Sequence, residues 1–321
     1  MTPLYRFRLQ LPRGTPFGTP PTSGTLFGHL CWAVRAREGR EGLEAFLAAL
    51  PQAPTAVSDL FPAGYLPRPL LPTPESRVPD DLRKKLKRRR YLSRPAWEAL
   101  RAAAEEAALE EKLEAEAADP PFFTRHRRAH HRLDHKQGKT AEEGGGPWFT
   151  EAYWPAAAEG ARGIEADLYV QTPHPPHWIA DLLAEVGARG YGRDATFGQG
   201  QFTVAGWEEE QALAAPPPGT GPLRFLSLSQ GVITAAMRAP RWQRFVLFGK
   251  IGRDMMAEGL RPWKLPIVLA RAGATFGADT PPPHGIFGAW LTGIHQDRPD
   301  IGHNAFHVSL PYREAAKEGA P

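Results

Sequence analysis

The chain has 321 residues, of which 42% are apolar and 10% aromatic, so its length and composition fit a globular protein of one large or two ordinary domains. No run of about 18 apolar residues occurs, which argues against a membrane-spanning helix, and the first residues predict no signal peptide. Cys31 is the only cysteine, which excludes an internal disulfide and a cysteine-based zinc site and favours a cytoplasmic location.

The first two predicted elements are a strand and a helix. Residues 4–11 read LYRFRLQL, and the alternation of apolar and polar side chains predicts a half-buried strand. After a turn-rich stretch, TLFGHLCWAVRAR (25–37) places its large apolar residues on one helical stripe. Thr22 or Ser23 is available as the N-cap of this helix.

The same order returns later in the chain. Residues 166–172 alternate like a strand, and an apolar stripe that begins at Trp178 predicts a second helix. A glycine-rich loop, GYGRDATFGQGQF (190–202), then leads into a further strand, QFTVAGW. Two such units that share one sheet predict a ferredoxin-like (RRM-like) domain over residues 1–214.

Two segments interrupt or end this pattern. Residues 80–160 are predicted to be an insertion, in which a basic block, RKKLKRRR (83–90), runs into an acidic helix over about 95–118 and then into a long loop or extended hairpin. The stretch APPPGTGP (215–222) predicts a domain boundary. Strand-like pieces beyond it predict a second, mostly β domain over 223–321.

The basic block and the glycine loop each allow two interpretations. The basic block either contacts a polyanion or forms a solvated helix face. Glycine allows positive φ and close approach of another backbone, so the loop either turns its amides toward a phosphate or makes a tight connection between helix and strand. We favour the phosphate-binding interpretation, because a tight connection needs only one or two glycines.

The histidines are a further candidate feature. His126, His130, His131 and His135 have spacings that suit metal ligands, but the neighbouring arginines would repel a cation, so phosphate or base contacts or plain surface are favoured and no metal or cofactor is expected. His29, on the first helix, is either a general acid or base of metal-independent RNA cleavage or a packed, satisfied histidine.

Taken together, these segments resemble a known family. The order SGTLFGHLCWAVR, FPAGYLPRPLLP, KKLKRRRYLS, HHRLDHKQGKT, GYGRDATFGQGQF, RPWKLPIVLARAGATF and HVSLPYR is similar to the RAMP superfamily of CRISPR proteins. Within it, the order is most similar to the Cas-five group and the family of the fourth subunit of the type III-A Csm effector. His131 and His135 depart from the family pattern His-Asn-Arg-Ile-Asp-Arg, whereas Arg132 and Asp134 match it.

The resemblance implies an α+β fold of tandem ferredoxin-like domains, with a glycine-rich loop and a long insertion in the first. It implies a non-catalytic subunit that holds the 5′ handle of the crRNA. The implied protein partners are the large polymerase-like signature subunit and the backbone RAMP subunits of the effector, with no membrane involved.

The residues expected to contact RNA come from five parts of the chain and are mostly glycines, arginines, lysines and aromatic side chains, with a few other polar residues. Tyr191 and Phe197 are the candidates for base stacking. The full set is Ser23, Lys84, Lys85, Arg128, Arg132, Asp134, Gly190, Tyr191, Gly192, Arg193, Thr196, Phe197, Gly198, Gln199, Gly200, Lys250, Arg253 and Lys264.

Two other functions remain open at this point. One is a metal-independent RAMP endoribonuclease that matures the guide, with His29 or a loop histidine as its acid or base. The other is a scaffold without RNA contact, whose affinity for its partners would not depend on salt through phosphate contacts.

Overall fold

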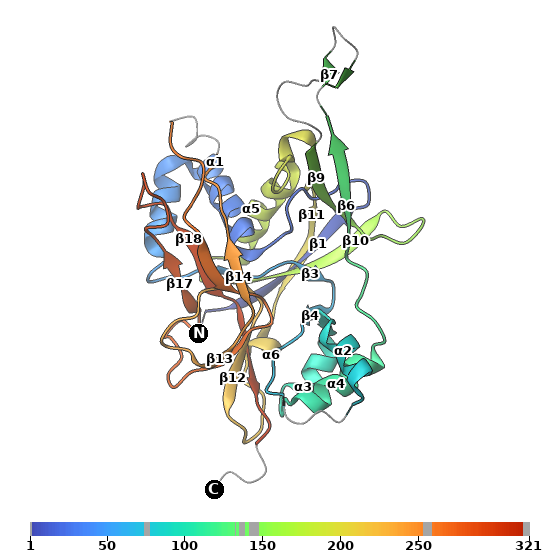
Figure 1. The fold of residues 1–321 in the computed structure, drawn as a ribbon. Coiled ribbons are helices and arrows are strands. Elements are labelled where there is room, and N and C mark those ends of the chain that lie inside the picture. The colour runs from blue at the N-terminus through green and yellow to red at the C-terminus, as the bar shows by residue number, and fades with distance from the viewer. Residues whose placement is uncertain are drawn as a thin grey trace.

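The computed structural model describes residues 2–73, 78–131, 133–134, 139–140, 148–252 and 259–316. Figure 1 shows a two-part arrangement, with the C-terminal strands on one side, a group of short helices on the other, and a β-ribbon that projects from the body. No helix in the described part of the chain is long and apolar enough to cross a membrane.

The first sheet is antiparallel, and its strands come from distant parts of the sequence. Its order is β11-β1-β10-β2, and the short strand β3 pairs with the other end of β10. Helix α1 follows β1 and helix α5 follows β10, so each predicted strand–helix unit is present. The bounds are β1 Leu4–Pro12, α1 Ser23–Ala49, β2 Ala56–Val57, β3 Phe61–Pro62, β10 Gly163–Gln171, α5 Pro176–Arg189 and β11 Thr203–Glu209.

The alternation in β1 explains how this sheet divides its two faces. Phe7, Leu9 and Leu11 are fully buried. On the other face, Arg6 lies 3.5 Å from Asp167 and 3.0 Å from Glu210. Arg6 is therefore a structural ion-pair partner, whereas Arg8 on the same face is exposed.

The insertion contains three short strands, three helices and a longer two-stranded ribbon, and the short strand β4 (Tyr65–Pro67) precedes it. Its elements are α2 Asp80–Lys87, β5 Tyr91–Ser93, α3 Arg94–Leu100, α4 Glu106–Ala115, β6 Phe123–His130, β7 Leu133–Asp134, β8 Lys139–Thr140 and β9 Trp148–Pro155. Strands β6 and β9 pair antiparallel, so the extended hairpin is the correct alternative for this part of the insertion.

The single acidic helix expected over 95–118 is wrong. The chain leaves the helical path after Leu100, because the buried Arg101 donates to the carbonyls of Ala212 (2.7 Å) and Pro311 (3.1 Å). The amide of Ala104 donates to Arg313 O at 2.7 Å. These contacts with the C-terminal half separate α3 from α4.

The C-terminal half is mostly β, as predicted, and no helix follows α6 among its described residues. Its sheets have the order β13-β16-β12-β19, β14-β15 and β17-β18. The bounds are α6 Gln211–Ala214, β12 Leu223–Ser227, β13 Arg238–Arg241, β14 Arg244–Leu247, β15 Ile267–Ala270, β16 Thr275–Gly277, β17 Phe287–Leu291, β18 His303–His307 and β19 Ser309–Arg313. The α+β class is confirmed, whereas the division into two domains stays a prediction.

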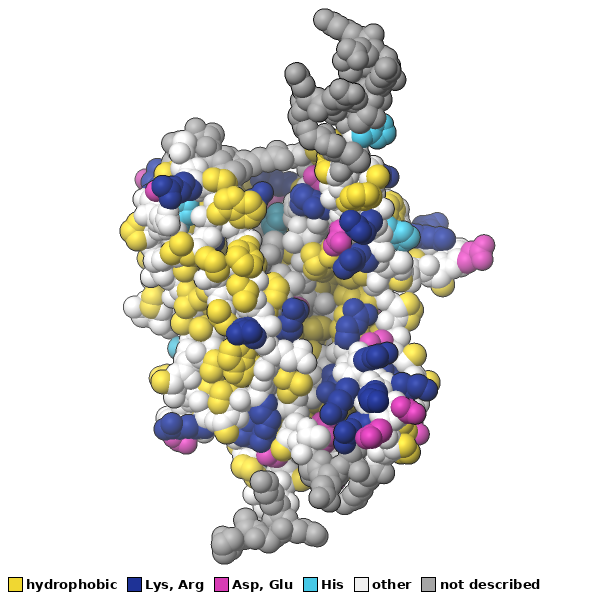
Figure 2. All heavy atoms as spheres, in the orientation of Figure 1, with side chains coloured by type: hydrophobic (Ala, Val, Ile, Leu, Met, Phe, Trp, Pro, Cys, Tyr) yellow, Lys and Arg dark blue, Asp and Glu magenta, His cyan; other side chains and the backbone are white. Residues whose placement is uncertain are grey.

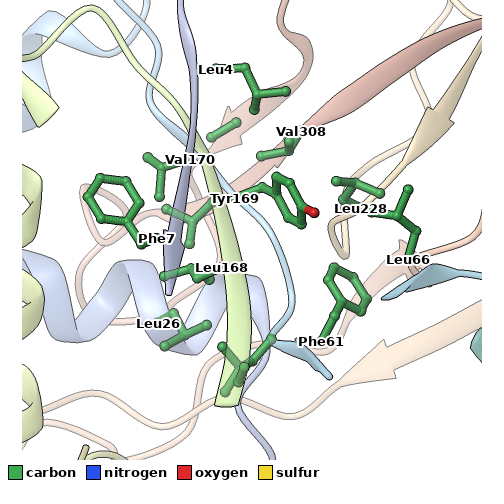
Figure 3. Packing of buried hydrophobic residues seen from close by; sticks show 14 of the residues in the cluster. Leu4, Phe7, Leu26, Phe61, Leu66, Leu168, Tyr169, Val170, Leu228 and Val308 are labelled. Carbon is green, nitrogen blue, oxygen red and sulfur yellow. The ribbon is translucent and has the colours of Figure 1, made fainter. Parts of the chain in front are cut away.

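One hydrophobic core runs through both halves. Figure 3 shows Tyr169 of β10 beside Leu228 and Val308 of the C-terminal half, with Phe61 and Leu66 of the N-terminal half close by. All five side chains are buried. The C-terminal strands therefore complete the core of the first sheet.

Candidate nucleic-acid interface

All four glycines of the loop between α5 and β11 have a positive φ, in the left-handed region. Their φ values are 90° at Gly190, 79° at Gly192, 80° at Gly198 and 72° at Gly200. A short 3-10 helix, η1 (Ala195–Phe197), lies between the two pairs. Such φ values are disfavoured for any residue with a Cβ atom, which explains why glycine occupies these positions.

Three of the four glycines also serve contacts inside the protein. A Cβ at Gly190 would overlap the carbonyl oxygen of Gln199, and one at Gly200 would overlap that of Tyr191. A Cβ at Gly192 would lie 2.9 Å from Cβ of Thr19. Of the four, only Gly198 has no atom within 4 Å of the position of a Cβ. The other three glycines are needed for contacts within the connection itself, so the argument that a tight connection needs only one or two glycines is wrong.

The amides of all four glycines, which the predicted nest would use, have partners inside the protein. Eight loop N–H groups already donate within the protein, those of residues 190–193 and 197–200. For example, Gly198 N donates to Ala195 O at 3.0 Å and Gly200 N to Pro16 O at 2.8 Å. Because these amides have partners, they are not available to a phosphate in this conformation.

Tyr191 anchors the loop and does not offer a stacking surface. The side chain is fully buried, with its ring centroid 6.0 Å from that of Phe17. Its hydroxyl donates to Pro20 O at 2.8 Å and accepts from Thr22 N at 3.2 Å. The expectation that Tyr191 stacks on a base is corrected by this burial.

His29 fastens the same loop to α1. Its Nε2 accepts the N–H of Gly192 at 2.9 Å, and its ring lies 4.8 Å from that of Tyr191. Burial lowers the pKa of His29 to about 4, so the ring is neutral at pH 7. The packed, satisfied histidine is therefore the interpretation that the geometry favours.

The tip of the loop is the part that faces solvent. Phe197 is 82% exposed, and Thr196 and Gly198 beside it are also exposed. Gln199 is partly buried, and its Oε1 has no hydrogen-bond partner among the described atoms. An aromatic side chain this exposed loses the free energy of burial, which favours a role in contact with a partner.

Arg193 joins the loop to the β6–β9 ribbon. Its guanidinium donates to the carbonyl of Glu151 in β9 and lies 3.2 Å from Asp194. On the neighbouring edge, the N–H of Phe17 donates to Tyr153 O at 2.9 Å. The loop tip and the ribbon therefore form one surface, called here the loop–ribbon surface, made of Arg193, Thr196, Phe197, Gly198, β6 and β9.

The ribbon carries cations and aromatic rings side by side. The Arg127 guanidinium lies 4.6 Å from the ring centroid of Phe149, and His130 stacks on Trp148 at 5.5 Å. Phe149, Trp148 and Arg128 are exposed. The sequence analysis missed Trp148 and Phe149, because the glycine-rich segment before them has no apolar period and only their position opposite the basic strand reveals them.

The basic helix α2 lies apart from the loop–ribbon surface. Figure 1 places α2 with α3 and α4, well away from β6 and β9, and Figure 2 shows two separate groups of Lys and Arg side chains in these places. Lys84 and Lys85 are exposed. Arg89, by contrast, is almost buried, and donates to Leu113 O and Ala118 O, each at 2.8 Å.

The remaining predicted contacts divide between buried and undescribed positions. Ser23 is buried, where its Oγ accepts from Gln230 N at 2.9 Å, so the expected RNA contact is corrected to a structural one. Lys264 is partly buried, and its Nζ donates to Gly302 O at 2.9 Å. Lys250 is exposed, with Nζ 4.2 Å from the ring centroid of Trp263.

Four of the predicted residues have no described side chain. Arg132, Arg253 and His135 lie outside the described residues, and Asp134 belongs to β7 but only its backbone is described. Among the described residues, no group of three or more His, Cys, Asp or Glu is arranged to hold a metal ion.

The strand order, the two strand–helix units and the small antiparallel C-terminal sheets define an α+β fold. A scan against protein-family models gives no match, and a search of curated proteins gives none either. Solved structures, however, match the chain over its full length.

Two of these structures are type III-A CRISPR assemblies. A chain of the Csm3–Csm4 subcomplex of the type III-A interference complex has a TM-score of 0.57 at 12% identity, over 96% of this chain and 99% of that one. A chain of the Csm1–Csm4 cassette in complex with pppApA has a TM-score of 0.54 at 18% identity, over 98% and 100%. The fold is therefore that of a Csm4-like RAMP protein.

Proposed function

We propose that the chain is a non-catalytic RNA-binding subunit of a Csm effector, which holds the 5′ handle of the crRNA on the loop–ribbon surface. The proposal rests chiefly on Phe197, whose exposed ring stands beside Gly198 and next to a ribbon of cations and aromatic rings. The Csm4-like fold supports it, and so does the sequence resemblance, which also implies tandem ferredoxin-like domains.

The contacts on this surface suit a single-stranded RNA. Bases that are not paired stack on exposed aromatic side chains, and arginine contacts the phosphates and the base planes. Phe197 supplies a ring at the loop tip, Phe149 lies with Arg127 on one face of the ribbon, and Trp148 lies with Arg128 on the other face. The absent Cβ of Gly198 lets a ribose or phosphate come close to the main chain without an amide hydrogen bond.

A second surface is suited to a protein partner. Val246 of β14 and Val268 of β15 are paired across the two strands, and both are exposed. Phe248 (66% exposed) and Trp263 (55% exposed) extend this apolar face, which Figure 2 shows as yellow side chains on the half opposite α2. A contiguous apolar face of this kind is typical of protein interfaces.

The proposal also names a partner for this face. The solved assemblies contain Csm1 or Csm3 together with Csm4. We assign the β14–β15 face to the large signature subunit, because that subunit needs a docking area separate from the RNA-binding loop. The backbone RAMP subunits would then contact another part of the chain.

The absence of catalysis is part of the proposal. The rival endoribonuclease needs a histidine that can exchange a proton, and His29 uses its Nε2 to accept the Gly192 N–H. Its pKa of about 4 also makes it a weak base. Incubation of the protein with repeat RNA in EDTA is expected to leave the RNA intact, and cleavage lost in His29→Ala would contradict the proposal.

The test of RNA binding uses Phe197. In an electrophoretic shift assay with the crRNA handle, Phe197→Ala is expected to weaken binding about 5- to 100-fold, because stacking contributes about 1–3 kcal/mol per base. Phe197→Tyr retains the ring and is the matched control. Unchanged affinity in Phe197→Ala at low and high salt would contradict the assignment of the loop tip.

The two surfaces can be tested against each other. The double variant Phe248→Ser with Trp263→Ser is expected to lose co-purification with the large subunit and to keep its affinity for the handle. Phe197→Ala is expected to do the reverse. If the double variant and Phe197→Ala each lose both interactions, the two surfaces are not separate.

A further inference from the structure

A cavity of about 400 Å³ lies between α1 and the C-terminal strands, away from the glycine loop. Helix α1 serves both places, because His29 bonds to the loop whereas Gly24, Gly28 and Cys31 line the cavity. A cavity of this size is within the range of small-molecule sites in proteins. It is large enough for a ring system with a charged group.

Three aromatic side chains line this cavity, and the chain holds two of them in place. A Cβ at Gly252 would overlap the ring of Trp32, and a Cβ at Gly302 would overlap that of Trp290. The ring centroid of Phe27 lies 5.9 Å from that of Trp290. Glycine at both positions lets the backbone pack directly on the indoles, so the aromatic wall is preformed.

On the polar side of the cavity, the positive charge of Lys264 has no negative charge beside it. Lys264 donates to Gly302 O at 2.9 Å, and no described carboxylate lies within ion-pair distance of its Nζ. Burial lowers the pKa of Lys264, because it disfavours the charged ammonium group. A partly buried cation without a counter-ion is costly, and an anion in the cavity would relieve that cost.

His303 supplies a second unmatched polar group in the same cavity. The residue is only 7% exposed, and its Nε2 has no hydrogen-bond partner among the described atoms. Burial, together with the charge of Lys264, lowers the pKa of His303 to about 4, so the ring is neutral at pH 7. A buried polar atom without a partner in a cavity points to a ligand that bonds to it.

We propose that this cavity binds one nucleotide, with the base against Phe27, Trp32 and Trp290 and the phosphate toward Lys264. A purely apolar ligand would leave Lys264 and His303 unmatched, and inorganic phosphate would leave the aromatic wall empty. The nucleotide is either a free mononucleotide or one residue of a bound RNA strand. In the second case alone, the inference rests on the proposed function.

The first test uses a substitution that fills the cavity and preserves the fold. Gly28 is inside α1, lines the cavity and has no atom within 4 Å of a Cβ position. Gly28→Leu therefore places a side chain in the cavity and also removes a residue of low helix propensity. Gly28→Ala is the matched control, because it has the same effect on the helix and fills almost none of the space.

Binding is measured by quenching of tryptophan fluorescence, with AMP, GMP, CMP, UMP, adenosine and a handle oligonucleotide as probes. We expect wild type and Gly28→Ala to bind a mononucleotide or the oligonucleotide, and Gly28→Leu to bind it at least tenfold more weakly. A mononucleotide that binds identifies a free ligand, whereas binding of the oligonucleotide alone identifies a residue of the strand. Equal binding by Gly28→Leu and Gly28→Ala for every probe would overturn the inference.

A second variant tests the place of the phosphate. Lys264→Gln is expected to lose the preference for the phosphorylated probe, AMP over adenosine or a 5′-phosphorylated over an unphosphorylated oligonucleotide, by about 10- to 100-fold. A preference that survives in Lys264→Gln would contradict the assignment. Phe197→Ala leaves the cavity intact and therefore tests only the proposed function. If Phe197→Ala loses handle binding and the cavity variants do not lose binding of any probe, this inference fails and the proposed function stands.

Discussion

Gly198 and Gly200 have nearly the same φ but opposite surroundings. A Cβ at Gly200 would overlap the backbone of Tyr191, whereas a Cβ at Gly198 would stand in open space. Gly200→Ala is therefore expected to cost about 3 kcal/mol or more of unfolding free energy, and Gly198→Ala only about 1 kcal/mol of backbone strain. Urea unfolding of the two variants measures the difference.

Substitutions at the two glycines also differ in whether they test contact with RNA. Gly198→Asn keeps the loop contacts, because asparagine tolerates positive φ, and its side chain blocks close approach from solvent, so handle binding should fall while unfolding changes no more than in Gly198→Ala. Gly200 variants cannot separate binding from folding, and substitution there does not test RNA contact. Equal destabilisation by Gly198→Ala and Gly200→Ala would contradict this reading of the loop.

The sequence could show that this loop needs glycine but not why. Positive φ is a local property, and a cluster of glycines indicates it. The reason for Gly192 is Thr19, and the reason for the burial of Tyr191 is Pro20 and Phe17, all far away in sequence. Contacts of this kind are set by the tertiary fold, so the single exposed ring, Phe197, could not be told from Tyr191 beforehand.

At the scale of elements, one basic run contains two kinds of residue. Arg89 bonds to Leu113 O, Ala118 O and Asp119, and so fastens α2 to the end of α4. Lys85, four residues earlier, is exposed. Arg89→Met is expected to destabilise the α2–α4 unit by about 2–4 kcal/mol, because it leaves buried acceptors without a donor.

Hydrogen exchange measures this effect. Amide protection in α4 should fall in Arg89→Met and stay unchanged in Lys85→Gln, which removes the same charge from the surface. Lys85→Gln should instead reduce RNA affinity slightly if α2 lies along the RNA path. Equal protection of α4 in both variants would show that Arg89 does not hold the helices together.

Elements with a strong period were predicted well, and those that depend on distant contacts were not. The alternation in residues 4–11 identified β1, because one of its faces is buried more deeply than the other, and the alternation in 166–172 identified β10, although residues 166–171 are buried on both faces. The Ala- and Glu-rich segment after Arg94 reads as one helix by propensity. Arg101 ends it early by bonding to carbonyls of the C-terminal half, and propensity contains no information about those.

For the whole molecule, three neutral histidines predict loss of stability in mild acid. Burial lowers the pKa of His29, His303 and His307 from 6.5 to about 4. The unfolded chain binds protons at these sites below pH 6.5 and the folded chain does not until about pH 4. Each histidine should therefore cost about 2 kcal/mol of stability between pH 7 and pH 5.

Buried carboxyl groups act in the opposite direction but less strongly. Burial raises the pKa of Asp59 to about 6, so the stability linked to Asp59 increases by about 1 kcal/mol as the pH falls from 7 to 5. Burial also raises the pKa values of Asp167 and Glu210. Urea unfolding at pH 7 and pH 5 should still show a net loss, which His307→Gln should reduce. A stability that rises toward pH 5 would contradict the prediction.

Strand β1 has a consequence for how the chain emerges from the ribosome. Leu4 lies opposite Gln171, and Tyr5 lies opposite Glu209. The first strand to be synthesised therefore stays unpaired until just over half of the polypeptide has been translated, when β10 emerges, and β11 follows later. During that interval Phe7, Leu9 and Leu11 have no sheet to cover them, so nascent chains should depend on chaperones or early partner subunits to escape aggregation.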